Sequence, residues 1–82
     1  MIITTNERDL LLWNQFKNGS REGFTTIFTT YYPFLFNYGC KITPDVTLVE
    51  DCIQELFLEL WQTRGKAEIV SVRAYVFTAF KF

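Results

Sequence analysis

Histidine is absent from the 82 residues, and the chain has only two cysteines, Cys40 and Cys52. Without histidine, the usual catalytic triads and zinc sites cannot be assembled, and a cysteine-only metal site needs more than two thiols. The sequence therefore predicts a protein that is not an enzyme and holds no metal or other cofactor. The two cysteines form no CxxC motif and accompany no secretory leader, so we expect two reduced, buried thiols.

Long apolar runs and a strong net charge are also lacking. No run approaches the ~20 apolar residues of a membrane-spanning helix, so the sequence predicts a soluble, cytoplasmic protein with no membrane partner. The formal net charge of −1 is unlike that of a domain that binds duplex DNA through its phosphates alone. We therefore expect any contact with DNA to be local.

What the chain has in abundance is aromatic residues, which make up 18% of it within 49% hydrophobic residues. That content is enough to build a core, and this length allows one small domain. No repeat is visible, and no segment alternates long enough to indicate a strand. The sequence predicts an all-α fold, a compact bundle of about four helices, with residues 1–82 as a single domain.

The first two helices have recognisable ends. We expect Asn6 to cap the first helix and Asn18-Gly19 to end it. Ser20 is expected to cap a second helix, in which apolar residues recur at three-and-four spacing from Phe24 to Ile42. Pro33 lies inside that pattern and should kink the helix without ending it, because the spacing resumes beyond it.

The third and fourth helices follow a turn at residues 43–45. Thr47 and Glu50 have the spacing of a capping box, which predicts a third helix from about Leu48 to Gln62. A linker over residues 63–70 separates it from a fourth helix that Ser71 is expected to cap. At ~100° per residue, one side of the third helix is continuously apolar. The residues on that side are Val49, Cys52, Ile53, Leu56, Phe57 and Leu60.

The opposite side of the third helix is acidic. Residues 45–62 contain five acids and no base, a sum of −5. Leu58 falls in the middle of this side and Trp61 at its edge, where a helix without a partner would carry polar residues. Apolar residues ringed by acids favour an interface for a basic partner. An ordinary solvated helix face is the alternative.

The last twenty residues have the opposite charge. Residues 63–82 contain four bases and one acid, a sum of +3. Aromatic residues, among them Tyr75, are interleaved with these bases, a mixture that binds single-stranded nucleic acid by stacking and phosphate contact. Aromatic residues that face the core would give the same pattern, so both interpretations remain open.

Three segments together resemble a known family. They are Tyr31-Tyr32-Pro33, the third-helix run from Glu50 to Trp61, and the run from Val72 to Phe77. This order is similar to the polymerase-binding and promoter-melting region, region 2, of extracytoplasmic-function sigma factors, especially the branch common in Bacteroidetes. The resemblance covers roughly residues 10–81, and its most specific part is Asp-x-x-Gln-Glu-x-Phe-x-x-Leu-Trp in the third helix.

The resemblance implies two partners, core RNA polymerase and promoter DNA. The third helix would lie against the clamp helices of the polymerase β′ subunit. Together with the helical wheel, this gives the predicted polymerase-binding residues Asp51, Gln54, Glu55, Leu58 and Trp61. The loop after that helix would hold a flipped-out base of the minus-ten non-template strand. The predicted DNA-binding residues are Arg64, Lys66, Arg73, Tyr75 and Lys81. An anti-sigma factor is a further partner that the resemblance allows.

The chain departs from the family pattern at three points. Thr78 and Ala79 stand where primary sigma factors have the tryptophan pair that wedges open the duplex, and Phe82 stands where relatives have asparagine. The helix-turn-helix region 4, which reads the minus-thirty-five element, is absent from this chain. A stand-alone helical adaptor that has lost DNA binding is therefore the alternative function. A helical-bundle enzyme is a third candidate, but its carboxylates would line an exposed face without converging.

Overall fold

The computed structural model describes residues 4–63, 66 and 68–80, and within them it contains four helices and no strand. The helices are α1 (Thr5–Lys17), α2 (Arg21–Ile42), α3 (Val46–Thr63) and α4 (Val72–Ala79). The predicted all-α fold with about four helices is confirmed.

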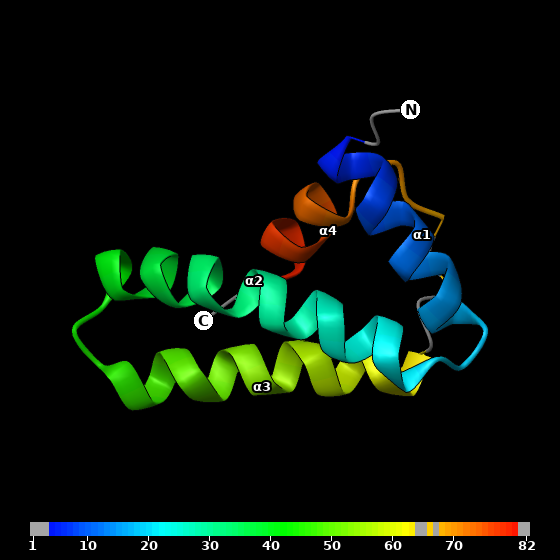
Figure 1. The fold of residues 1–82 in the computed structure, drawn as a ribbon. Helices are drawn as coiled ribbons and strands as arrows, with labels where there is room; N and C mark the ends of the chain where they lie inside the picture. Colours follow the sequence, from blue (N-terminus) through cyan, green and yellow to red (C-terminus); the bar gives the residue numbers. More distant parts are fainter. Residues whose placement is uncertain (1–3, 64–65, 67, 81–82) are drawn as a thin grey trace.

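The longest two helices, α2 and α3, form an antiparallel hairpin (Figure 1). Helix α1 folds back over the N-terminal part of α2, and α4 packs beside α1 above the same side of the hairpin. The end of the hairpin where α2 turns into α3 extends past α1 and α4, so the molecule measures 41 × 29 × 20 Å. Two parts of α2 therefore have different surroundings, a covered N-terminal part and a more open C-terminal part.

Thr4 caps helix α1. Its hydroxyl accepts a hydrogen bond from the Glu7 amide at 3.1 Å. The prediction that Asn6 caps this helix is wrong. Asn6 lies inside the first turn, and its side-chain amide donates to the Val70 carbonyl at 3.2 Å, which ties α1 to the segment before α4. At the other end, Gly19 has φ of 94°, a left-handed conformation that favours glycine after a helix C-terminus.

The cap of α2 is Ser20, as predicted, and that of α4 is Ser71, also as predicted. The predicted capping box of α3 is wrong. The Asp45 carboxylate accepts from the Leu48 amide at 3.0 Å, so α3 begins at Val46 and Thr47 lies within its first turn. Aspartate and threonine can both cap a helix, and here the aspartate does so. The helix ends at Thr63, one residue beyond the expected end.

Two local features fix how α2 runs. The helix continues through Pro33, as the resumed spacing predicted. Gly23, in its first turn, lies so close to α1 that an added Cβ would stand 2.9 Å from the Leu12 carbonyl oxygen. Glycine is therefore required here for the close approach of two helices rather than for an unusual backbone conformation.

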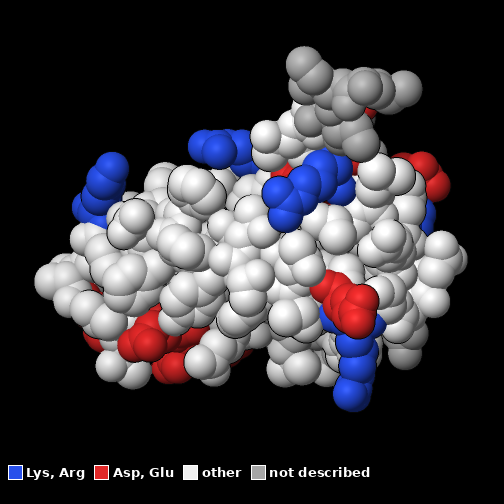
Figure 2. Space-filling model, viewed as in Figure 1, with Lys and Arg blue, Asp and Glu red and all other residues white. Residues whose placement is uncertain are grey.

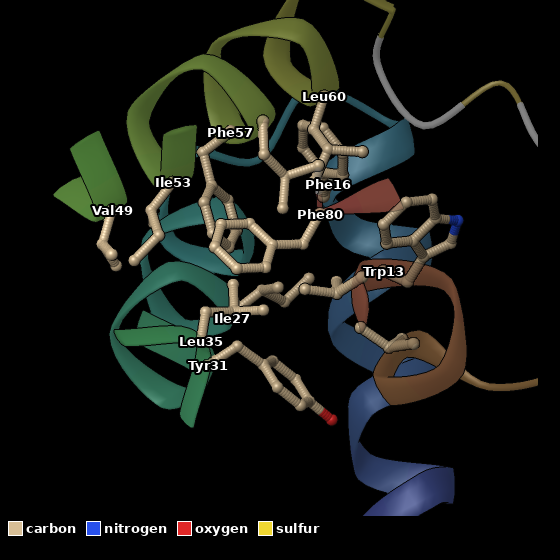
Figure 3. Close-up of a cluster of buried hydrophobic side chains, with 13 residues drawn as sticks. Trp13, Phe16, Ile27, Tyr31, Leu35, Val49, Ile53, Phe57, Leu60 and Phe80 are labelled. Atoms are coloured by element: carbon tan, nitrogen blue, oxygen red, sulfur yellow. The ribbon is translucent and has the colours of Figure 1, made fainter. Parts of the chain in front are cut away.

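The core fills the space between the hairpin, α1 and α4 (Figure 3). Its buried members are Trp13, Phe16, Ile27, Tyr31, Leu35, Val49, Ile53, Leu56, Phe57, Leu60, Val72, Val76 and Phe80. The predicted inner side of α3 is confirmed, with Cys52 half-buried and the other five residues buried. On α2 the predicted apolar stripe reaches further than the core does, since Tyr38 and Ile42 are exposed.

Both cysteines are free, but the prediction that they are buried is wrong for Cys40, which is exposed, and only half right for Cys52. One buried polar residue was not predicted. Asp9 is 4% exposed, and its carboxylate accepts a hydrogen bond from the Tyr31 hydroxyl. In Figure 3 that hydroxyl is turned toward α1. The Asp9–Tyr31 pair therefore joins α1 to the middle of α2 inside the core.

Candidate partner-binding surfaces

The outer side of α3 carries four of the five predicted polymerase-binding residues in one line. Asp51, Gln54, Glu55 and Leu58 are all exposed, and their spacing of three, four and seven residues places them on a single face. We call these residues, together with Glu59, the acidic edge. Leu58 is 56% exposed in its middle. In Figure 2 one group of acidic side chains lies at the lower left, over α3.

The fifth residue, Trp61, lies differently. It is half-buried, and its ring centroid lies 5.2 Å from that of Phe24 and 6.1 Å from that of Phe16. Trp61 therefore packs against α1 and α2 at the edge of the acidic side, and it borders the same hollow as Leu58. These contacts arise because the N-terminal part of α2 lies beside the C-terminal part of α3, which a single-helix wheel cannot represent.

A hollow of about 480 Å³ lies between α2 and α3 next to Leu58. Its walls are formed by Arg21, Phe24, Thr25, Phe28, Gln54, Phe57, Leu58 and Trp61. Three of the predicted polymerase-binding residues thus border the same largely aromatic recess. An exposed leucine beside an apolar hollow and a row of acids is suited to a helical partner that presents both apolar and basic side chains.

The charge of α3 affects groups on its flank. Burial raises the pKa of the Cys52 thiol, and the negative charges of Glu55 and Asp51 raise it further. Burial also raises the pKa of Tyr32, with a contribution from Glu50. Within the part of the chain that the structure describes, no base lies within 4.0 Å of these α3 carboxylates; the single ion pair there joins Lys17 to Glu68 at 3.8 Å. The acidic edge is therefore not neutralised by the described residues of the domain.

The predicted DNA-binding residues lie in several places. Arg64 and Lys81 fall outside the described residues, and Lys66 is exposed. Arg73 is exposed on the first turn of α4. Tyr75 is half-buried, with its ring centroid 5.3 Å from that of Trp13. The structure thus brings Tyr75 to the core and leaves Arg73 toward solvent, and the role of each in DNA binding remains a prediction.

Arg73 has aromatic neighbours that the sequence did not indicate. Its guanidinium carbon lies 5.7 Å from the centroid of the Phe34 ring on α2 and 5.5 Å from that of Phe77 on α4. Residues 34 and 73 are far apart in the chain, so only the helix packing brings them together. The one available signal was that Phe34 falls between the core positions Tyr31 and Leu35, out of step with the buried spacing.

Two classes of site receive no support from the structure. The described residues contain no cluster of three or more cysteine, aspartate or glutamate side chains that would hold a metal ion. None of the helices is both long and apolar enough to cross a membrane, again counting the described residues only.

Comparison with known proteins assigns the family. Searches of curated proteins and of solved structures found no significant match. The family described as Sigma-70 region 2 matches over residues 27–81, which include most of α2 and all of α3 and α4. This is about two-thirds of the chain, and it contains both the acidic edge and Arg73. The chain therefore belongs to the sigma-70 region 2 family, whose members are non-enzymatic transcription initiation factors that bind core RNA polymerase and promoter DNA.

Proposed function

We propose that this chain is region 2 of an extracytoplasmic-function sigma factor, a single helical domain that acts in the cytoplasm. In this proposal the acidic edge docks on the β′ clamp helices of core polymerase, and the segment after α3 holds the minus-ten non-template strand. The observation that carries the proposal is an unpaired acidic row with Leu58 exposed at its centre. The subtype, with its likeness to Bacteroidetes members, rests on the residue pattern from Asp51 to Trp61.

The docking step combines charge and apolar contact. Five acids without a base over residues 45–62 attract a basic helical surface and speed its encounter. Leu58 then buries its exposed side chain against the partner, while Gln54 offers an amide for a hydrogen bond at the border of the hollow. The rest of α3 is fixed by its buried side, so its outer face meets the partner already ordered, and little entropy is lost on binding.

The DNA step uses the opposite end of α3 and the start of α4. Arg64 and Lys66 belong to the segment between α3 and α4, and Arg73 is exposed immediately after it. Such a segment can enclose one extruded nucleobase, while the nearby arginine and lysine side chains contact a few phosphates. Thr78 and Ala79 provide no tryptophan wedge. Because few phosphates are neutralised, strand binding by the free domain should be weak and should strengthen when polymerase presents the strand.

Charge reversal on the acidic edge tests the docking step. We expect Asp51→Lys combined with Glu55→Lys to abolish binding to purified core polymerase, measured by a pull-down and by fluorescence anisotropy of labelled domain. Both side chains are exposed, so the circular dichroism spectrum should be unchanged. Glu7→Lys, a reversal of an exposed acid on α1, is the matched control and should bind like the parent. Unchanged affinity of the doubly reversed protein would reduce the acidic edge to a solvated helix face.

A separate experiment distinguishes a sigma factor from the alternative, a helical adaptor that has lost DNA binding. A sigma factor bound to core polymerase must confer binding to a minus-ten promoter fragment, whereas an adaptor would bind polymerase and confer none. Grafting the residue 64–71 segment of another family member into the protein should also change promoter preference. If promoter preference does not change, this segment does not read the base.

A further inference from the structure

The C-terminal part of α2 and the exposed side of α4 together form a surface, and the function proposed above uses only Arg73 of it. Phe34 and Tyr38 on α2 are 49% and 46% exposed. Arg73 and Phe77 on α4 lie beside them. We call these four residues the aromatic platform. Large aromatic side chains left half exposed on a small domain indicate a ligand.

The four side chains form one connected surface. The Arg73 guanidinium lies over both the Phe34 and the Phe77 rings, at 5.7 and 5.5 Å from their centroids. The Tyr38 ring meets Phe77 edge-on, with centroids 5.8 Å apart and an interplanar angle of 85°. Such contacts hold rings and guanidinium in place before a ligand arrives, and an ordered surface loses little entropy on binding.

Two exposed cations border the aromatic platform. Lys41 is exposed and follows Phe34 and Tyr38 at positions seven and three residues later, on the same face of α2. Arg73 lies beside Phe34, and Lys41 lies seven residues further along α2. Seven residues of α-helix span about 10 Å, so the two cations flank the exposed rings of α2. Arg73 has no carboxylate within 4.0 Å among the described residues. In Figure 2 the red side chains of this half of the molecule lie on the opposite border, over α3.

This combination matches single-stranded DNA better than a protein helix. Bases stack on exposed ring faces and phosphates pair with flanking cations, which is how single strands are bound without an apolar groove. A helical partner would need such a groove, and the hollow lined by Phe24 and Leu58 lies near the other end of α2. The densest row of acids, Asp51, Glu55 and Glu59, lies on α3 and not on either helix of the platform.

We propose that the aromatic platform is a stacking site for single-stranded DNA, in which Phe34 and Tyr38 of α2 stack on bases and Arg73 and Lys41 contact phosphates. This places strand contacts on α2, apart from the segment after α3, and gives the stacking role to α2 rings instead of Tyr75. The biological setting rests on the proposed function. The binding itself does not, because it can be measured without polymerase.

The test is a titration of the 82-residue chain with fluorescein-labelled single-stranded oligothymidylate at low salt, where weak phosphate contacts are strongest. We expect Phe34→Ala to weaken binding about five- to 150-fold, the range for loss of one stacked base. Phe34→Trp should bind at least as well as the parent, whereas Phe34→Leu, which keeps apolar area without a ring, should bind poorly. Leu11→Ala, at an equally exposed site on α1 (55%), is the control and should not change the affinity.

Two further readouts separate stacking from other modes. An abasic strand of equal length should bind much more weakly than oligothymidylate. Arg73→Gln should lower the slope of log affinity against log salt by about 0.7, the share of one single-strand phosphate contact. Equal binding by Phe34→Leu and the parent, or no binding by the parent at low salt, would overturn the proposal. So would variants that lose core-polymerase affinity but keep oligonucleotide affinity, because the platform would then be a polymerase contact.

Discussion

The acidic edge of α3 and the aromatic platform of α2 and α4 are built in different ways. All five residues of the acidic edge lie on one helix, whose inner side is anchored by Val49, Ile53 and Leu60 with at most 3% of each residue exposed. The platform takes its members from two helices that are separated by some thirty residues of chain. The acidic edge therefore exists wherever α3 is folded, whereas the platform exists only while α4 is docked.

The docking of α4 depends on α1. Helix α4 has only eight residues, too few to be stable alone in water. Val72 and Val76 are fully buried, the Tyr75 ring meets Trp13 of α1, and Asn6 of α1 holds the Val70 carbonyl. A change that loosens α1 should thus disturb the platform before it disturbs the acidic edge. The two surfaces can be separated by mutation.

The largest expected effect contrasts the two sides of α3 themselves. Leu56→Ala should lower the free energy of unfolding by about 2–5 kcal/mol, because Leu56 is 6% exposed in the core. Leu58→Ala, two residues further along the same helix, should stay within about 0.5 kcal/mol of the parent. Urea unfolding followed by circular dichroism measures both. Similar stabilities for the two variants would mean that the inner and outer sides of α3 are misassigned.

The next effect concerns the contact between α1 and α2 beneath the platform. Tyr31→Phe removes the hydroxyl that donates to the buried Asp9 carboxylate and should cost about 1–3 kcal/mol. Tyr38→Phe, on an exposed ring, should cost almost nothing. Urea unfolding at neutral pH compares them. A loss as large for Tyr38→Phe as for Tyr31→Phe would contradict a special role for the buried pair.

The same hydroxyl predicts how stability depends on pH. Burial raises the pKa of Tyr31 well above its ordinary value of 10.0, and the hydrogen bond and negative charge of Asp9 raise it further, although Arg73 opposes them. Because the folded pKa is the higher one, this stabilisation is complete below about pH 10 and is lost at higher pH, where the unfolded chain ionises first. Stability should fall above pH 10, and less steeply in Tyr31→Phe. If the stability of Tyr31→Phe fell as steeply with pH as that of the parent, ionisation of Tyr31 would not be the cause.

A smaller effect tests the start of α3. Asp45→Ala should cost about 1 kcal/mol, because the carboxylate accepts from the Leu48 amide at the helix N-terminus. Thr47→Ala, at the residue that the sequence indicated as the cap, should cost less than half as much. Thermal unfolding of both variants ranks the two residues. A larger loss of stability for Thr47→Ala than for Asp45→Ala would indicate that Thr47 caps the helix after all.

The smallest expected effect compares the two thiols, one on each helix of the hairpin. Cys40 is exposed and should react quickly with a thiol reagent at pH 8. Cys52 should react slowly, because it is half-buried and its raised pKa leaves little thiolate. Mass spectrometry after partial labelling identifies the modified residue. Faster labelling at Cys52 would show that α3 opens more readily than the packed hairpin implies.

The sequence predicted the helices and the acidic edge well because each depends on one periodic segment. The spacing of Val49, Ile53 and Leu56 determines which side of α3 is buried, so Asp51, Glu55 and Leu58 followed as the outer side. Where one residue's surroundings come from another helix, the wheel did not predict them. Trp61 packs against Phe24 because the start of α2 lies beside the end of α3, and no wheel of α3 contains that information.

The aromatic platform and the Asp9–Tyr31 pair were outside the reach of single-helix patterns for the same reason. Phe34 and Arg73 meet through the docking of α4, and Asp9 is buried by α2, not by its own helix. The caps at Asn6 and Thr47 failed for a more local reason. Thr4 and Asp45, which lie two residues before them and have similar capping ability, provide the cap hydrogen bonds instead.

The central claim is that α3 binds core polymerase through its outer side, and one comparison tests it directly. Leu58 and Leu11 are 56% and 55% exposed, so their truncations remove equal apolar surface from different helices. We expect Leu58→Ala to weaken the affinity for purified core polymerase about tenfold or more, as for a central interface residue, and Leu11→Ala to leave it unchanged. Equal affinities for Leu58→Ala, Leu11→Ala and the parent would contradict the claim.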